Sequence, residues 1–220
     1  MARIKRGILG GVKGTVGTVA GASWNGINYV RALPEHYKDP KTFKQLNQRS
    51  KFMFTLNFHQ QFTDVLRIGF KGYAKKMSGF NAALSYNLKN AVEGESPEFS
   101  INYPQFLVSR GQLTLPFNVT VAADEPGMVT LNWENNSGTG TAKTDDDAFV
   151  VIFNPDKASV TYFTDEATRG EGICKVPVPQ TYSGDKVHCF LAFIRMNDLV
   201  NKAGKKLVSN SVYAGEVTIS

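Results

Sequence analysis

The sequence predicts an α+β protein: an N-terminal β-hairpin arm and a helical hairpin, followed by an immunoglobulin- or fibronectin-like antiparallel β-sandwich. Three observations support this fold class. Glycine and β-branched residues dominate 1–34, apolar residues recur at helical spacing in 35–98, and short β-rich runs alternate with turn residues in 99–220. We therefore expect a glycine-rich basic arm with a hairpin, a helical segment and a sandwich domain over these three ranges.

The arm contains a strong turn signal. Asn25-Gly26 is a preferred dipeptide of two-residue hairpin turns, so strands are expected at about 18–24 and 27–32. Alternation along the second strand then places Ile27, Tyr29 and Arg31 on one face, and Asn28 and Val30 on the other. A two-stranded hairpin is marginally stable alone. This one is expected to dock on another surface, either in its own chain or in a second copy.

The middle segment predicts two helices. Asp39 suits a helix cap and Pro40 the first helical position. Apolar residues then recur every three or four positions, which predicts one helix over about 40–68. Ser78 or Gly79 begins a second helix with a clean apolar stripe. The two helices are expected to form a hairpin.

The C-terminal segment predicts strands at the spacing of a β-sandwich. Trp133 stands in an alternating run and is expected to anchor the core. The runs 149–153 and 189–194 are continuously apolar, which is typical of central strands. The expected strands are 105–109, 112–121, 127–133, 148–153, 159–163, 172–178, 186–195 and 211–219.

Charge divides the chain into two halves. Residues 1–110 carry 16 Lys and Arg against 6 Asp and Glu, whereas residues 111–220 carry 9 against 13. Two explanations are compatible with this asymmetry. The basic half contacts nucleic acid or another polyanion, or the halves attract each other between neighbouring copies. The candidate phosphate contacts in the arm are Arg3, Lys5, Arg6, Lys13 and Arg31.

The sequence has no apolar stretch of the length that spans a membrane. Its N-terminus begins like a signal peptide, but Lys13 interrupts the glycine-rich stretch that follows, so no export is expected. Cys174 and Cys189 lie in apolar runs and are expected to be buried free thiols, as in a reducing compartment. The alternative is a disulfide, which requires their Cα atoms to lie within about 7 Å of each other. The expected location is the cytoplasm, or a particle assembled there.

No arrangement of residues predicts catalysis, a cofactor, a metal ion or a small-molecule substrate, so the protein is expected not to be an enzyme. The N-terminal glycines lack the lysine that follows a phosphate-binding loop. His36, His59 and His188 fall in different elements; His59 is expected to be partly exposed, and His188 to face away from Cys189. The acidic run 145–147 suits either calcium or a solvated turn, and its spacing favours the turn.

Several stretches of the sequence are specific enough to indicate a family. They are Gly17-Thr-Val-Ala-Gly-Ala-Ser-Trp-Asn-Gly-Ile-Asn-Tyr-Val-Arg-Ala-Leu-Pro34, Asp39-Pro-Lys-Thr42, Gln48-Arg-Ser-Lys-Phe52, Trp133-Glu-Asn-Asn-Ser-Gly-Thr-Gly140 and Asn210-Ser-Val-Tyr213. With these stretches the chain resembles an uncharacterised family of Bacteroidota proteins along most of its length. The resemblance implies a bacterial or bacteriophage source and implies no activity.

Together these observations favour a self-assembling structural protein, such as a filament, sheath or virion component, over an enzyme. The sandwich offers edge strands that can accept another strand, and the arm offers large apolar side chains that gain from burial. We expect a homo-oligomer that associates through the arm and the sandwich edges. The expected assembly residues are Trp24, Ile27, Tyr29 and Val30. The alternative is a nucleic-acid-binding protein that uses the basic N-terminal half.

Overall fold

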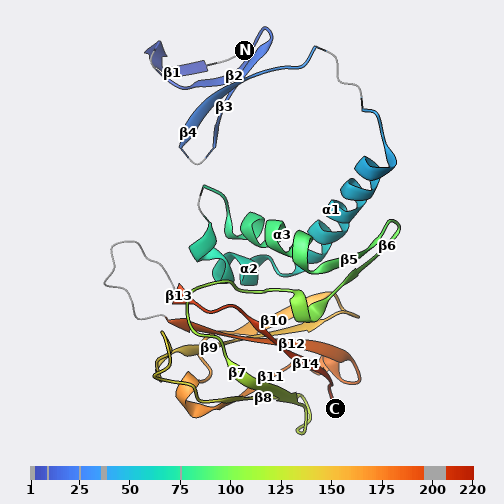
Figure 1. Cartoon of the computed structure of the whole chain (residues 1–220), viewed down its shortest axis with the longest axis vertical. Helices are drawn as coiled ribbons and strands as arrows, with labels where there is room; N and C mark the ends of the chain where they lie inside the picture. The colour runs from blue at the N-terminus through green and yellow to red at the C-terminus, as the bar shows by residue number, and fades with distance from the viewer. Residues whose placement is uncertain (1–2, 9, 25, 36–38, 75, 196–206) are drawn as a thin grey trace. The chain divides into compact units, whose positions relative to one another are not determined.

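The chain folds into two compact units, Met1–Leu46 and Asn47–Ser220. The computed structural model in Figure 1 describes residues 3–8, 10–24, 26–35, 39–74, 76–195 and 207–220, and of residues 3–8 it describes the backbone alone. The first unit is built on a β-sheet, and the second is a β-sandwich with helices on one face.

The N-terminal unit contains a four-stranded antiparallel sheet whose strands follow one another in chain order. They are β1 (Arg3–Ile8), β2 (Val12–Val16), β3 (Val19–Trp24) and β4 (Ile27–Ala32). The β3–β4 hairpin confirms the predicted strands at 18–24 and 27–32 to within one residue. Gly26 has a φ of 80°, as this tight turn requires, and Asn25 lies outside the described residues. Two further strands precede the hairpin, so the predicted arm is itself a sheet.

The helices that follow are α1 (Phe43–Gln61), α2 (Thr63–Gly69) and α3 (Gly79–Asn90). The single helix predicted over 40–68 is wrong, because α1 and α2 are separate helices. α1 begins at a capping box, in which the Gln45 amide donates to Thr42 Oγ1 and the Thr42 amide donates to Gln45 Oε1. None of the described helices is long and apolar enough to cross a membrane.

The second predicted helix is confirmed as α3. Ser78 caps it, because its Oγ accepts a hydrogen bond of 3.2 Å from the Asn81 amide. A hairpin that was not predicted follows at once: β5 (Val92–Glu95) and β6 (Glu98–Ile101). Short 3-10 helices also connect the elements of this unit: η1 (Lys71–Tyr73), η2 (Tyr103–Gln105), η3 (Arg169–Glu171) and η4 (Gln180–Tyr182).

The predicted antiparallel sandwich is confirmed. One sheet has the strand order β11-β8-β7, and the other has the order β10-β9-β12, with β13 and β14 both pairing with β12. The strands are β7 (Phe117–Ala122), β8 (Met128–Glu134), β9 (Asp147–Asn154), β10 (Ser159–Phe163), β11 (Ile173–Pro177), β12 (Lys186–Arg195), β13 (Leu207–Val208) and β14 (Val212–Thr218).

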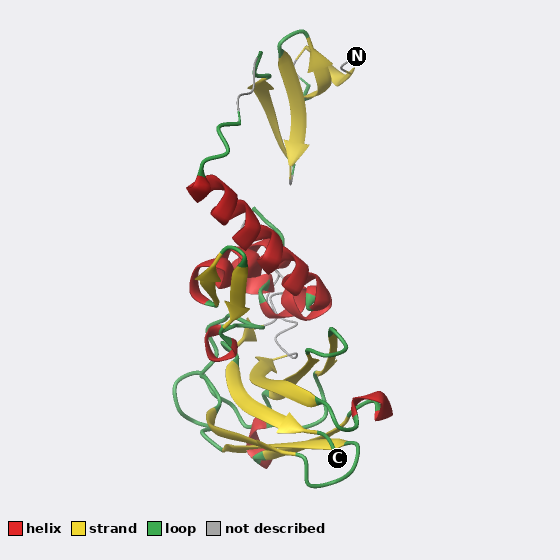
Figure 2. Ribbon diagram, turned by 90° about the vertical axis from the view of Figure 1, so that its right-hand side faces the viewer, coloured by secondary structure: helices red, strands yellow, loops and turns green. Residues whose placement is uncertain are grey.

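The sheet that contains β9 and β12 is buried on both faces. Cys189 points from β12 into the sandwich, whereas Phe190 points the other way and packs in a cluster with Leu66 of α2. Figures 1 and 2 show the helices as a third layer over this sheet. The runs 149–153 and 189–194 are continuously apolar because both of their faces need apolar side chains.

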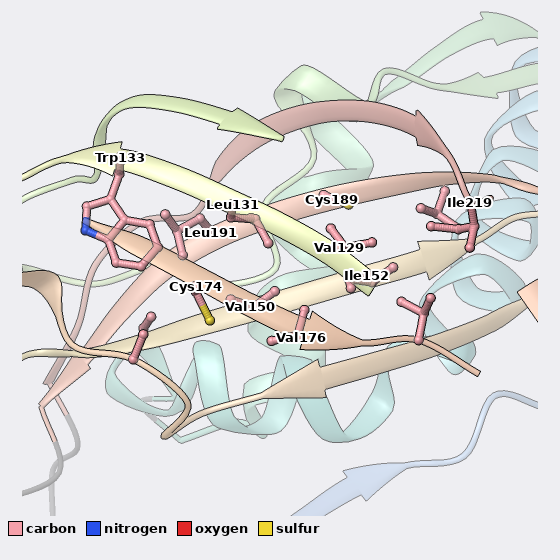
Figure 3. Close-up of a cluster of buried hydrophobic side chains, with 14 of the residues drawn as sticks. Val129, Leu131, Trp133, Val150, Ile152, Cys174, Val176, Cys189, Leu191 and Ile219 are labelled. Carbon is pink, nitrogen blue, oxygen red and sulfur yellow. The ribbon is translucent and has the colours of Figure 1, made fainter. Parts of the chain in front are cut away.

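Trp133 anchors the interior of the sandwich, as predicted. It is 5% exposed, and its Nε1 donates a hydrogen bond of 2.9 Å to the Arg169 carbonyl. Its neighbours on β8, Leu131 and Val129, line the same interior as Leu191 of β12 (Figure 3).

Two predicted strands are wrong in whole or in part. In the first, Gln105 ends η2 and residues 106–109 are irregular. The predicted strand over 112–121 is extended sheet only from β7 onward. Pro116 has no N–H to donate to a ladder. The Thr114 carbonyl accepts a hydrogen bond of 2.9 Å from Arg169 Nη2 instead of a strand partner. The strand therefore begins only after Pro116, and the hydrogen bond from the distant Arg169 side chain takes the place of strand pairing at Thr114.

Candidate functional site

The predicted assembly residues lie on both faces of the N-terminal sheet. In the β3–β4 hairpin Trp24 pairs with Ile27, and Ala22 pairs with Tyr29. Directly paired residues share a face, so Trp24, Ile27 and Tyr29 lie together, and we call them the hairpin face. Val30 pairs with Gly21 and lies on the opposite face. The structure thus brings together three of the four predicted residues.

The opposite face is partly covered by the beginning of β2. A Cβ atom at Gly21 would lie 2.3 Å from the Val12 carbonyl oxygen, and one at Gly11 would lie 2.4 Å from Asn28 Cγ. Gly14, inside β2, has a φ of 109°, a conformation that suits a bend in the strand. The high glycine content predicts that the backbone approaches another chain segment closely. The structure shows such an approach between strands of this one sheet.

The large side chains of this sheet are exposed. Trp24 is 55% exposed, Tyr29 46% and Val30 60%. Among the described residues 10–24 and 26–34, Gly21 alone is buried. Val16 is also exposed. It is not among the predicted residues of this surface, although it belongs to the repeated Gly-Thr-Val pattern. The sheet has no hydrophobic core among these residues.

The predicted phosphate contacts come from three strands of the same sheet. Arg3 and Lys13 are direct partners across β1 and β2. Arg31 pairs with Ala20, next to the hairpin face. The side chains of Arg3, Lys5 and Arg6 lie outside the described part of the chain. The backbone nevertheless places this basic group in a sheet.

The acidic run 145–147 is not a solvated turn, because Asp146 is fully buried. One carboxylate oxygen accepts a hydrogen bond of 3.0 Å from Arg169 Nε, and the other accepts one of 2.8 Å from Arg195 Nε. The Arg169 guanidinium also lies 3.7 Å from the centre of the Phe193 ring. We call Asp146, Arg169 and Arg195 the buried charge cluster. No group of acidic, histidine or cysteine side chains within the described residues is arranged to hold a metal ion.

The prediction that His59 is partly exposed is wrong, since the side chain is fully buried. Its Nδ1 donates to the Thr55 carbonyl at 2.8 Å, and its Nε2 accepts from Asn87 Nδ2 at 3.1 Å. Burial lowers the pKa of His59 from 6.5 to about 4, although hydrogen bonds to backbone carbonyls raise it. The imidazole is therefore neutral at physiological pH and connects helices α1 and α3. His36 lies outside the described residues.

His188 and Cys189 face opposite sides of β12, as predicted. The His188 ring stacks on Tyr103 with 3.6 Å between ring centres, whereas Cys189 lies inside the sandwich. Cys174 and Cys189 are both free and buried, which confirms the predicted thiols. Burial raises the pKa of Cys174 to about 11 and that of Cys189 to about 12, so neither forms a thiolate at neutral pH.

Comparisons with known proteins give structural neighbours and a family. The fn3 domain of the human collagen alpha-1(XX) chain is 14% identical over 50% of this chain and 89% of that domain, with a TM-score of 0.35. The fn3 domain of human contactin 1 is 11% identical over 51% of this chain and 83% of that domain, with a TM-score of 0.32. A search of curated proteins finds no match. A family model described as a family of unknown function, DUF6266, matches residues 11–215, and this chain therefore belongs to that family.

Proposed function

We propose that this chain is a non-enzymatic structural protein whose N-terminal sheet joins copies of the protein, as in a filament, a sheath or a virion. The observation that carries the proposal is the missing core of the sheet, in which Gly21 alone is buried among the described residues 10–24 and 26–34. A sheet with apolar side chains needs a second layer to remove them from water. We propose that a second copy supplies this layer, in the cytoplasm or in a particle assembled there.

The edges of the sandwich support a second contact between copies. Three edge strands each carry one large exposed apolar side chain: Phe117 on β7, Tyr162 on β10 and Ile173 on β11. Edge strands present unpaired backbone groups that another strand can use. One contact through the N-terminal sheet and a different one through a sandwich edge would extend an assembly beyond a dimer.

Deletion of residues 1–34 is expected to leave a folded monomer, whereas the intact protein is expected to be oligomeric in a native mass measurement. Folding should survive because both hydrophobic clusters of the second unit consist of residues from Phe58 onward. The double substitution Trp24→Ser and Tyr29→Ser should have the same effect without shortening the chain, since each buried aromatic side chain contributes about 1.5–3 kcal/mol.

Tyr73→Ser is the matched control, because Tyr73 is an exposed tyrosine on η1 of the second unit, outside both the hairpin face and the sandwich edges. It should leave the contact through the N-terminal sheet intact. An intact protein that stays monomeric at high concentration would contradict self-association. A deletion variant that unfolds would indicate that the sheet docks within its own chain.

Nucleic-acid binding is the second candidate, and the density of charge in the first unit favours it. Residues 1–46 contain eight Lys and Arg against two Asp and Glu. If these side chains neutralise phosphates, the logarithm of the affinity for duplex DNA should fall with the logarithm of the salt concentration, with a slope of about −0.9 per phosphate. Replacing Arg3, Lys5 and Arg6 with alanine should make that slope shallower by roughly 3 and weaken binding to all sequences alike.

The control for this experiment keeps the charge and changes the side chains. Arg3→Lys, Lys5→Arg and Arg6→Lys together should preserve the slope, because the slope depends on the number of phosphates neutralised. The absence of measurable binding by the unaltered protein at low salt would eliminate this candidate.

A further inference from the structure

β4 ends the N-terminal sheet, and no other strand among the described residues pairs with its outer edge. The Leu33 amide donates a hydrogen bond of 2.7 Å to the Thr18 carbonyl, just beyond the pair of Val19 and Ala32. Along an antiparallel ladder, every second residue bonds to the neighbouring strand. Counting back from Leu33, the odd-numbered residues of β4 bond to β3, and the even-numbered ones point their N–H and C=O groups outward. Those residues are Asn28, Val30 and Ala32.

The two edges of this sheet differ in charge. β1, at one edge, has three basic residues among its six: Arg3, Lys5 and Arg6. β4, at the other edge, has one, Arg31. Charged residues on an edge strand discourage pairing with another strand. β4 is therefore the edge that is open to a second copy, and β1 is the edge protected from it.

We propose that β4 pairs with β4 of a second copy in antiparallel orientation, with Val30 facing Val30 across a two-fold axis. This inference rests on the proposed self-association and adds an edge-to-edge contact to it, since pairing of the two β4 strands does not itself cover the hairpin face. A two-fold axis perpendicular to the sheet leaves every side chain on the face where it started. Opposite residues of the two strands must point to the same face, so the axis has to pass between two copies of one residue. The register centred on Val30 sets Asn28 against Ala32 on each side and uses all of the outward-pointing groups of β4.

The side chains fit this register. It places Tyr29 of each copy opposite Arg31 of the other, where the guanidinium can lie over the ring. A depression of about 270 Å³ lies beside β4, lined by Gly10–Val12 and Asn28–Val30. The Asn28 side chain occupies the space over Gly11, so apolar side chains of the second copy would enter the rest of the depression, next to Val30.

Val30→Pro tests the pairing. Proline removes the outward N–H but no hydrogen bond between β3 and β4, so the hairpin is expected to persist. A dimer loses two donors at once, and its dissociation constant in sedimentation or native mass measurements is expected to rise roughly 30-fold or more. Val30→Ala is the matched control: it keeps the N–H and should weaken the dimer less than Val30→Pro.

Disulfide trapping gives a second measurement that does not depend on proline. In the proposed register the Cα atoms of Val30 lie about 5.5 Å apart across the axis, within reach of a disulfide. Mild oxidation should therefore link Val30→Cys into a covalent dimer. Tyr29→Cys should not cross-link, because the two copies of residue 29 are offset by two positions along the strands. The native cysteines are buried and should not interfere.

The outcomes separate this inference from the proposed function. Equal dimerisation of Val30→Pro and Val30→Ala, or cross-linking through position 29 instead of 30, would overturn the proposed pairing. If the Trp24 and Tyr29 double variant were nevertheless monomeric, self-association through the hairpin face would stand. A wild-type protein that stays monomeric at all concentrations would overturn both the β4 pairing and the proposed self-association.

Salt dependence distinguishes this dimer from a contact between oppositely charged halves. The pairing brings together two units that each carry eight basic side chains against two acidic ones. Like charges repel and salt screens them, so the dimer is expected to tighten as salt rises. Dissociation at high salt would instead indicate attraction between a basic unit and the acidic half of another copy, and would overturn the pairing through β4.

Discussion

Replacing Asp146 with alanine is expected to lower the free energy of unfolding by about 3–5 kcal/mol, because it leaves two buried guanidinium groups without their carboxylate. Arg169 Nε lies 3.0 Å and Arg195 Nη2 lies 2.6 Å from the oxygens of Asp146. Burial lowers the pKa of Arg169, and the neighbouring Asp146 opposes that change. Denaturant unfolding of both proteins at pH 7, followed by tryptophan fluorescence, measures the difference.

Asp145→Ala is the matched control, since it removes a neighbouring carboxylate that is exposed. Its effect should stay within about 0.5 kcal/mol. Asp146→Asn keeps one acceptor oxygen but removes the charge, so its cost should fall between the two. A loss below about 1 kcal/mol for Asp146→Ala would show that Arg169 and Arg195 do not depend on this carboxylate.

Lowering the pH from 7 to 4 is expected to remove about 3 kcal/mol of stability through His59 alone. In the folded protein the pKa of His59 is about 4, against 6.5 in the unfolded chain. Between pH 6.5 and 4, His59 is therefore protonated in the unfolded state but largely neutral in the folded state. The free energy of unfolding decreases as the pH falls through this range. Protonation would also turn Nε2 from an acceptor into a donor facing the Asn87 amide group.

His59→Gln isolates this effect. The substitution removes the titrating group, so the stability of the variant should depend less steeply on pH between 6.5 and 4. The other titrating groups, including His188, remain in both proteins and cancel in the difference. Parallel curves of unfolding free energy against pH would mean that His59 does not take up a proton differently in the two states.

Features that depend on neighbouring residues follow from the sequence. The Asn25-Gly26 turn and the alternation around it predict the β3–β4 hairpin, because a two-residue turn sets the register of its own strands. The placement of Trp24, Ile27 and Tyr29 on one face follows from the same alternation. The short β-rich runs predict the sandwich for a similar reason, since strand alternation and turn residues are local signals.

The helical segment shows the limit of such patterns. The apolar stripe of α1 predicts burial along the whole helix, yet Phe43 is 70% exposed and Met53 is 53% exposed. Just beyond the end of α1, Phe62 is fully buried against the sheet. Periodicity identifies an amphipathic face, but it does not say which part of that face has a neighbour to pack against.

Tertiary structure alone decided the partners of the charged and polar residues. Asp146 meets Arg169 and Arg195, which follow it by 23 and 49 positions, and His59 meets Asn87 28 positions later. No local pattern marks these pairs, because a carboxylate on a turn and one in a buried cluster look alike in sequence. The sequence by itself determined the strands, the turns and the faces of the hairpin, which arise from backbone preferences over a few residues. Burial depends on which distant segments the fold brings together, and that is why only the structure distinguished the buried charge cluster from a solvated turn.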